Sequence, residues 1–215
     1  MPRRPVRSLG EFEDDPRVER YLGRYTDPAG CYAFVTYDQA PIHGGPVTAG
    51  DVLMANLLSL RLGWEDVIPL FALGEERPYA GLRRALDEAL DAARRLPALE
   101  CCTAEEARMP SLRSANEIAY AIEPHSAESP RSWTAVTVSK VLHRLSRNIP
   151  IIDSRVRSFY GSRWAGIIRA RLHEDLVRNR GWMTPIAERY AVRGDPLPLT
   201  RMADILIWMD GEAAN

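Results

Sequence analysis

The feature that most constrains the fold is the spacing of apolar residues, which recur every three to four positions along almost the whole chain. In "RPYAGLRRALDEALDAARRL" (77–96), alanine and leucine fall on one face of a helix and charged residues on the other. The pattern predicts an all-α protein, with an irregular segment at 26–47 that includes one extended piece at "YAFVTY". Further helices are expected at 15–25, 48–62, 64–73, 111–123, 133–145, 154–161, 162–179, 184–192 and 198–209.

The length of 215 residues suits one compact unit or two halves that share a core. The polar segment "PHSAESPRS" (124–132) predicts an N-terminal helical lobe at 1–123 and a C-terminal helical lobe at 124–215. The N-terminus lacks the apolar stretch of a secretion signal, and no apolar run approaches the ~18 residues of a membrane span. The three cysteines and four histidines form no disulfide framework or metal-ligand spacing. We expect a cytoplasmic monomer without metal, cofactor, membrane contact or protein partner.

Charge is distributed unevenly along the chain. Residues 1–107 hold 12 basic and 18 acidic groups, whereas residues 108–215 hold 16 basic and 11 acidic groups. Within 131–171 there are nine basic residues and one acid, Asp153. This surplus favours a polyanionic partner such as DNA, and a solvated arginine face is the alternative. The arginines expected to contact nucleic acid are Arg144, Arg147, Arg155, Arg157 and Arg163.

Lys140 is the only lysine among 28 basic residues. Lysine, unlike arginine, can lose its proton near neutral pH and become a nucleophile. Asp153 follows 13 residues later at the start of the next expected helix, beyond a turn closed by Pro150. Such a turn would bring both groups to one cleft, where neighbouring arginines would lower the pKa of Lys140. Asp153 as a simple helix cap and Lys140 as a phosphate contact are the alternatives.

The stretch "IPIIDSRVRSFYG" (149–161) resembles the helix-hairpin-helix DNA glycosylases, including the 8-oxoguanine type. In that superfamily a lysine helix is followed by an apolar-Pro-apolar-apolar-Asp-x-x-Val-x-Arg segment, matched here by Pro150, Asp153, Val156 and Arg157. "TVSKVLHRL" (137–145) would supply the lysine helix. The chain is also similar to an uncharacterised bacterial family with an "SK-x-LH" and "P-x-x-DSRV" pattern and a C-terminal segment like "RMADILIWMD" (201–210). The glycine-containing turn that usually precedes the lysine helix reads "ESPRSWTAVT" here, without glycine.

The resemblance implies a two-lobed glycosylase that cleaves the N-glycosidic bond of a modified or damaged base flipped from duplex DNA. Asp153 would stabilise the sugar cation or activate the nucleophile, and Lys140 would attack C1′ if the enzyme also has lyase activity. A nucleic-acid-binding protein without catalysis is the alternative that the missing glycine favours. A helical protein with no nucleic-acid role is the third. Further pocket candidates are Asp51, Asn56, Trp133 and His143.

Overall fold

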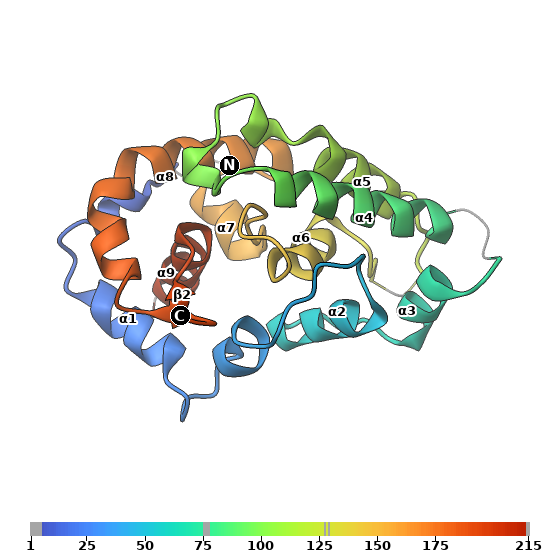
Figure 1. The fold of residues 1–215 in the computed structure, drawn as a ribbon, viewed down its shortest axis with the longest axis horizontal. Helices are drawn as coiled ribbons and strands as arrows, with labels where there is room; N and C mark the ends of the chain where they lie inside the picture. The colour runs from blue at the N-terminus through green and yellow to red at the C-terminus, as the bar shows by residue number, and fades with distance from the viewer. Residues whose placement is uncertain (1–5, 75–77, 127, 129, 214–215) are drawn as a thin grey trace.

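The computed structural model describes residues 6–74, 78–126, 128 and 130–213, and almost all of its regular structure is helical (Figure 1). The all-α prediction is confirmed at the level of fold class. The first five residues of the N-terminal segment and Arg77, at the start of the expected helix 77–96, lie outside the described residues. In the part of the chain that is described, we find no helix with the length and apolar character needed to cross a bilayer.

The principal helices, in chain order, are α1 (Arg17–Thr26), α2 (Ala49–Met54), α3 (Trp64–Phe71), α4 (Tyr79–Arg95), α5 (Pro110–Tyr120), α6 (Ala135–His143), α7 (Ser154–Phe159), α8 (Ala165–Ala187) and α9 (Leu199–Ala213). Two short strands, β1 (Ala191–Val192) and β2 (Asp195–Pro196), pair antiparallel. Single helical turns are η1 (Leu9–Phe12), η2 (Phe34–Asp38), η3 (Ala55–Leu58), η4 (Leu99–Cys101) and η5 (Glu106–Arg108).

Two clusters of buried apolar side chains form the core. One is built from α1, α7, α8 and α9, and the other from α2, α3, α4, α5 and α6. Figure 1 shows α1, α8 and α9 grouped at one end of the molecule and α2 to α5 at the other, with α6 and α7 between them. The first cluster therefore combines the two ends of the chain, and the second is made from its middle.

The expected division at residue 123/124 does not follow these clusters. It would separate α5 from α6, although both helices pack in the same cluster, and would separate α1 from α9, which pack against each other. The polar segment 124–132 marks a crossing of the surface between two helices of one cluster. A linker between two lobes and a surface connection within one cluster both face water, so both are polar and rich in proline. Composition alone therefore does not distinguish them.

Local sequence explains three departures from the predicted helices. In place of the two helices expected at 162–179 and 184–192, one long helix, α8, continues past Pro185 and ends at Ala187, since Met183 and Ala187 are buried in the core on either side of that proline. Pro185 stands in the last turn of α8, where loss of one N–H disturbs little of the ladder. Arg193 and Gly194 both have positive φ and close the unpredicted hairpin of β1 and β2.

The third departure shapes the functional site. The helix expected at 48–62 ends early, because α2 gives way to the tight turn η3 and then to Ser59, which is left-handed with φ 64°. A fourth departure is the expected extended piece at "YAFVTY" (32–37), the last four residues of which lie in the single π-helical turn η2. From η2, the Tyr37 hydroxyl donates a hydrogen bond of 2.7 Å to the carbonyl of Lys140 and so holds α6 in place.

Candidate functional site

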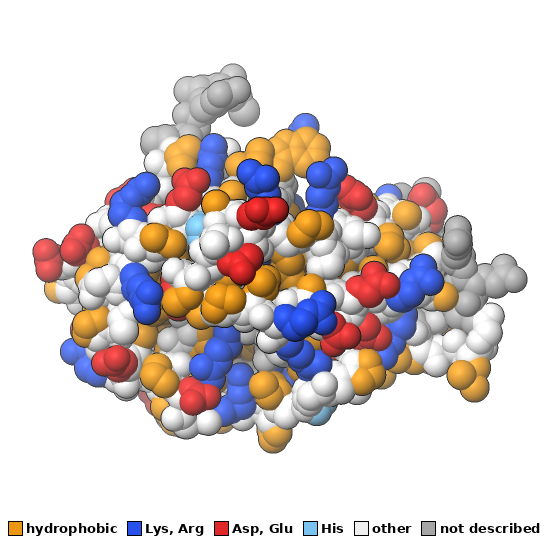
Figure 2. Space-filling view, turned by 45° about the horizontal axis from the view of Figure 1, so that its top comes forward, with side chains coloured by type: hydrophobic (Ala, Val, Ile, Leu, Met, Phe, Trp, Pro, Cys, Tyr) orange, Lys and Arg blue, Asp and Glu red, His pale blue; other side chains and the backbone are white. Residues whose placement is uncertain are grey.

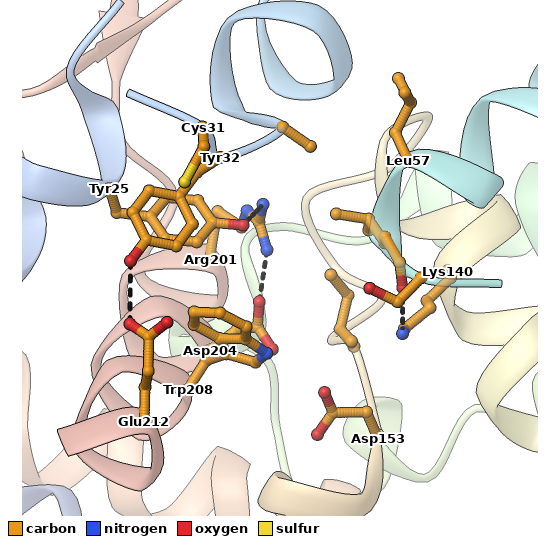
Figure 3. A pocket seen from close by; sticks show the side chains of 14 residues that line it. Tyr25, Cys31, Tyr32, Leu57, Lys140, Asp153, Arg201, Asp204, Trp208 and Glu212 are labelled. Atoms are coloured by element: carbon orange, nitrogen blue, oxygen red, sulfur yellow. Dashed lines mark hydrogen bonds and ion pairs between the residues drawn. The ribbon is translucent and has the colours of Figure 1, made fainter. Parts of the chain in front are cut away.

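Lys140 and Asp153 line one pocket of about 270 Å³, which we call the lysine pocket (Figure 3). It lies where the two apolar clusters meet: α6 and the turn after η3 form one wall, and α1 and α9 form the other. The structure therefore brings together the two residues that the sequence singled out. The other side chains used below are those of Tyr25, Tyr32, Arg201, Asp204, Trp208 and Glu212.

Lys140 is nearly buried, with 8% of its surface exposed. Its Nζ donates a hydrogen bond of 2.5 Å to the carbonyl of Leu58, which the left-handed Ser59 turns toward the pocket. Burial lowers the pKa of Lys140, although Asp153 and Asp204 oppose this shift by favouring the charged amine. The expected direction of the shift is thus present, but burial is its main cause, and the arginine that contributes is Arg201.

Asp153 is both a helix cap and a pocket residue. Its Oδ1 accepts the backbone N–H groups of Arg155 at 2.9 Å and Val156 at 3.0 Å, at the start of α7. Within the described residues, its Oδ2 accepts no hydrogen bond and Lys140 has no ion-pair partner. Figure 3 shows Asp153 and Lys140 on the same side of the pocket with open space between them. A carboxylate and an amine thus face a shared space without neutralising each other.

Helix α9 supplies a stripe of side chains that sequence reasoning missed. Arg201, Asp204, Trp208 and Glu212 follow at intervals of three, four and four residues, so they share one face of the helix. The segment "RMADILIWMDGE" is otherwise mostly apolar, and polar residues at helical spacing in such a segment are the signal that could have found them. This stripe forms the wall opposite Lys140.

Arg201 organises that wall. It is 2% exposed and binds Asp38 through two hydrogen bonds of 2.8 and 2.7 Å, and it also pairs with Asp204. Its Nη2 donates to the hydroxyl of Tyr25 at 2.9 Å. Burial raises the pKa of Asp204, and Asp153 raises it further, against the opposing effect of Arg201. The pocket thus contains a carboxyl group whose proton is held more tightly than in an ordinary aspartate.

Aromatic rings border the pocket beside these charges. Tyr25 and Tyr32 stack with their ring centroids 4.9 Å apart, and Trp208 meets Tyr32 edge-on at 5.6 Å. The Tyr32 hydroxyl donates to Glu212 at 2.8 Å, which anchors the ring to α9. The guanidinium of Arg155 covers Trp208 at 4.2 Å. Flat rings of this kind can hold a planar ligand by stacking.

The basic residues of 131–171 do not form one common face. Arg144 is buried and pairs with Asp51, Arg155 donates to the carbonyl of Trp208, and Arg147 pairs with Asp195. Arg157 and Arg163 line a different cavity, described below. Figure 2 shows basic and acidic side chains intermingled on the face that it displays. Part of the charge surplus along the sequence is therefore directed to partners within the protein.

The four further pocket candidates lie away from the lysine pocket. The Asp51 carboxylate accepts the Thr48 N–H in the capping box that begins α2 and also pairs with Arg144. Asn56 hydrogen-bonds both backbone groups of Leu62. Trp133 is fully buried, and its indole N–H donates to the carbonyl of Asp66.

His143 is also buried, and burial lowers its pKa to about 4, so its Nδ1–H donates to the carbonyl of Ile149 from a neutral ring. Each of the four candidates thus has a structural role that explains its polar or aromatic character. None of these roles involves the lysine pocket.

The fold and the pocket define a mostly helical protein with a buried lysine, two facing carboxylates and an aromatic border at the junction of two apolar clusters. A family model covers residues 17–211, and the chain belongs to that family, which is described as a family of unknown function, DUF6308. No curated protein and no solved structure matches the chain. All of the residues named for the lysine pocket except Glu212 lie within the matched range.

Proposed function

We propose that this protein is a DNA N-glycosylase that cleaves the bond between a modified base and its sugar, with Lys140 and Asp153 at the reacting centre. The observation that carries the proposal is that Lys140 and Asp153 line one pocket without forming an ion pair. A base flipped from the duplex would enter between the two apolar clusters and stack on Trp208 or Tyr32. The likeness of 149–161 to the helix-hairpin-helix glycosylases supports the same assignment.

The chemistry follows from the two groups. As the glycosidic bond breaks, its electron pair leaves with the base, which takes up a proton, and positive charge develops on the sugar. The Asp153 carboxylate stabilises that charge. The neutral amine of Lys140 attacks C1′, forms a C–N bond and releases a proton. The C1′–O4′ bond then breaks, O4′ takes up a proton and a Schiff base is left on C1′. Loss of the C2′ proton expels the 3′ phosphate by elimination, and the strand is cut.

The burial of Lys140 serves this step. An ammonium group cannot attack, and removal from water disfavours the ammonium form, so a larger fraction of Lys140 is the neutral amine at a given pH. Arginine could not replace it, because a guanidinium does not lose its proton in proteins. This is a physical reason for one lysine to persist in a chain that otherwise uses arginine.

The deciding experiment is borohydride trapping on a duplex that contains one abasic site. We expect the wild-type protein to become covalently attached to the DNA and Lys140→Arg to give no attached product. The matched control is the double variant Lys140→Arg/Arg178→Lys, which restores a single lysine at an exposed position of α8. That variant should also fail, because the reaction requires the amine in the lysine pocket.

A wild type that releases a modified base but is not trapped would assign the attack to water, with Asp153 as the activating carboxylate. Duplexes that carry uracil, hypoxanthine, 8-oxoguanine or an alkylated purine provide the base-release assay. If the wild type gives neither trapping nor base release on any of these duplexes, the enzymatic proposal is wrong.

A nucleic-acid-binding protein without catalysis is the second candidate. It is favoured by the N-terminus of α6, where the Thr134 hydroxyl accepts the Thr137 N–H at 3.3 Å and already occupies the helix start. In helix-hairpin-helix proteins a glycine turn at this place leaves backbone amides open to a phosphate. Binding of the abasic duplex without trapping, strand cutting or base release would support this candidate.

A further inference from the structure

A second, larger cavity of about 980 Å³ lies between α5, the first turn of α8 and the segments that carry Ala135, Ile152 and Arg157. We call it the arginine cavity. Among the residues that the structure describes, five arginines line it against a single acid, Glu117, which is already paired with Arg113 at 2.8 Å. The five are Arg108, Arg113, Arg157, Arg163 and Arg169. The cavity therefore carries a positive charge that its own side chains do not balance.

Unpartnered polar atoms are concentrated at this cavity. Over the described ranges, four buried side-chain atoms have no hydrogen-bond partner, and three of them belong to residues that line the arginine cavity. They are Asn116 Oδ1, Arg157 Nε and Arg169 Nη2. Buried polar atoms are almost always satisfied, so a cluster of exceptions around one cavity indicates a missing partner.

Arg169 is the strongest of the three. It is 2% exposed and donates to the carbonyls of Ala107 and Asn148, and within the described chain it has no carboxylate partner. Burial lowers the pKa of Arg169 to about 10. A buried cation without a counter-charge is unfavourable, and an anion bound in the cavity would relieve that cost.

The start of α8 adds backbone donors to the same cavity. Its first residues, Ala165, Gly166 and Ile167, line the cavity, and the preceding Trp164 makes no side-chain cap. The first N–H groups of a helix have no partner within it and carry partial positive charge, which favours a phosphate. Helix α8 runs for 23 residues, so its dipole is fully developed.

An aromatic platform lies beside these donors. Trp164 is 60% exposed and Tyr120 is 48% exposed, and both line the cavity. Arg163 stacks over Trp164 with its guanidinium 4.8 Å from the ring centroid. Exposed rings next to an arginine cluster suit a ligand that carries a flat group as well as an anion. The unpartnered Oδ1 of Asn116 offers an acceptor to an amino group on that flat group.

We propose that the arginine cavity binds a nucleotide, with its phosphate at Arg169 and the start of α8 and its base against Trp164. The phosphate of a free nucleotide and that of a nucleic-acid strand share this chemistry. The free nucleotide is favoured because Arg169 is almost completely buried, and a terminal phosphate can approach it where a duplex backbone is held at the surface. This proposal does not depend on glycosylase activity.

The two sites share a wall. Ser139 and Ile152 face the arginine cavity, whereas their chain neighbours Lys140 and Asp153 face the lysine pocket. The backbone N–H of Ile152 donates to Ser139 Oγ at 3.2 Å and joins the two segments of this wall. A ligand in either site is therefore separated from the other site by one layer of chain.

Calorimetric titration with AMP and GMP tests the proposal directly, with adenosine and inorganic phosphate as probes of the two halves of the ligand. We expect the nucleotides to bind, adenosine not to bind, and phosphate to bind more weakly. Trp164→Ala and Arg163→Gln change exposed residues, so the fold should survive, and each should weaken nucleotide binding by about tenfold. Arg180→Gln, an exposed arginine farther along α8, is the matched control and should bind as the wild type does.

Arg169→Met should abolish nucleotide binding, and circular dichroism will show whether that variant remains folded. A single-stranded oligonucleotide and a duplex are titrated in parallel. If they bind through Arg163 and Trp164 while the nucleotides do not, the free-nucleotide assignment is wrong. If neither nucleotide nor phosphate binds the folded wild type, the cavity is no phosphate site, whatever the trapping experiment at Lys140 shows.

Discussion

The lysine pocket and the arginine cavity balance charge in opposite ways. In the lysine pocket two cations, Lys140 and Arg201, face carboxylates at the start of α7 and on α9. In the arginine cavity five arginines face one acid that is already paired. A site with both kinds of titratable group can move protons and stabilise charge that appears during a reaction. A site with unbalanced fixed charge is suited to hold an anion.

The largest expected effect is on catalysis in the lysine pocket. Asp153→Asn should reduce single-turnover base release by about 10²- to 10⁴-fold, because the amide cannot stabilise the developing cation. Asparagine is a good N-cap, so the melting temperature should change little. The matched control is Asp195→Asn, an exposed aspartate on β2, which should keep the wild-type rate. Base release at the wild-type rate by Asp153→Asn would reduce Asp153 to a helix cap.

Arg201 and Arg169 provide the next test, since each is 2% exposed. Arg201→Met leaves Asp38 and Asp204 buried without their cation and should lower the free energy of unfolding by about 3–5 kcal/mol. Arg169→Met leaves only two carbonyls without donors and should cost about 1–3 kcal/mol. Urea denaturation measures both values. Equal losses would contradict the view that buried carboxylates balance the charge of Arg201 and not that of Arg169.

The smallest effect is a pH dependence of stability that separates Lys140 from Arg169. Burial lowers the pKa of Lys140 below 10.5, so as pH approaches that value the unfolded chain binds more protons than the folded chain. The contribution of Lys140 to the free energy of unfolding therefore increases with pH, by at most about 1.4 kcal/mol per pH unit.

The test is the free energy of unfolding of the wild type minus that of Lys140→Met. This difference should rise with pH below 10.5. The corresponding difference for Arg169→Met should stay flat until pH nears 10, where the lowered pKa of Arg169 lies. Urea denaturation across the alkaline range measures both. A flat result for Lys140 would show that its folded and unfolded pKa values are the same.

Elements that depend on nearby residues could be predicted from the sequence. The amphipathic stretch 77–96 forms α4 at Tyr79–Arg95, and Asp153 caps α7 as its position before "SRVRSF" indicates. The short turn closed by Pro150 indeed returns the chain so that Lys140 and Asp153 line the same pocket. These features depend on helical period, capping and turn chemistry, which act over a few residues.

Features that depend on distant partners could not be predicted in the same way. Arg144 counts toward a basic stretch in the sequence, yet its partner Asp51 lies 93 residues away and removes it from the surface. Asp204 becomes a pocket residue only because the packing of α1 and α9 in one cluster places α9 opposite the wall that carries Lys140. Arg169 looks like any arginine of an amphipathic helix until its burial without a carboxylate is seen.

The thin wall at Ser139 and Ile152 has a consequence in thermodynamic linkage. Ser139 Oγ accepts the Ile152 N–H and also donates to the carbonyl of Val136 at 2.9 Å, so one hydroxyl joins the α6 backbone to the segment before α7. If a ligand in one cavity shifts this wall and so changes the affinity of the other cavity for its ligand, the second ligand must change the affinity for the first by the same factor. Ser139 is thus one point at which a change in the wall of one cavity is passed to the wall of the other.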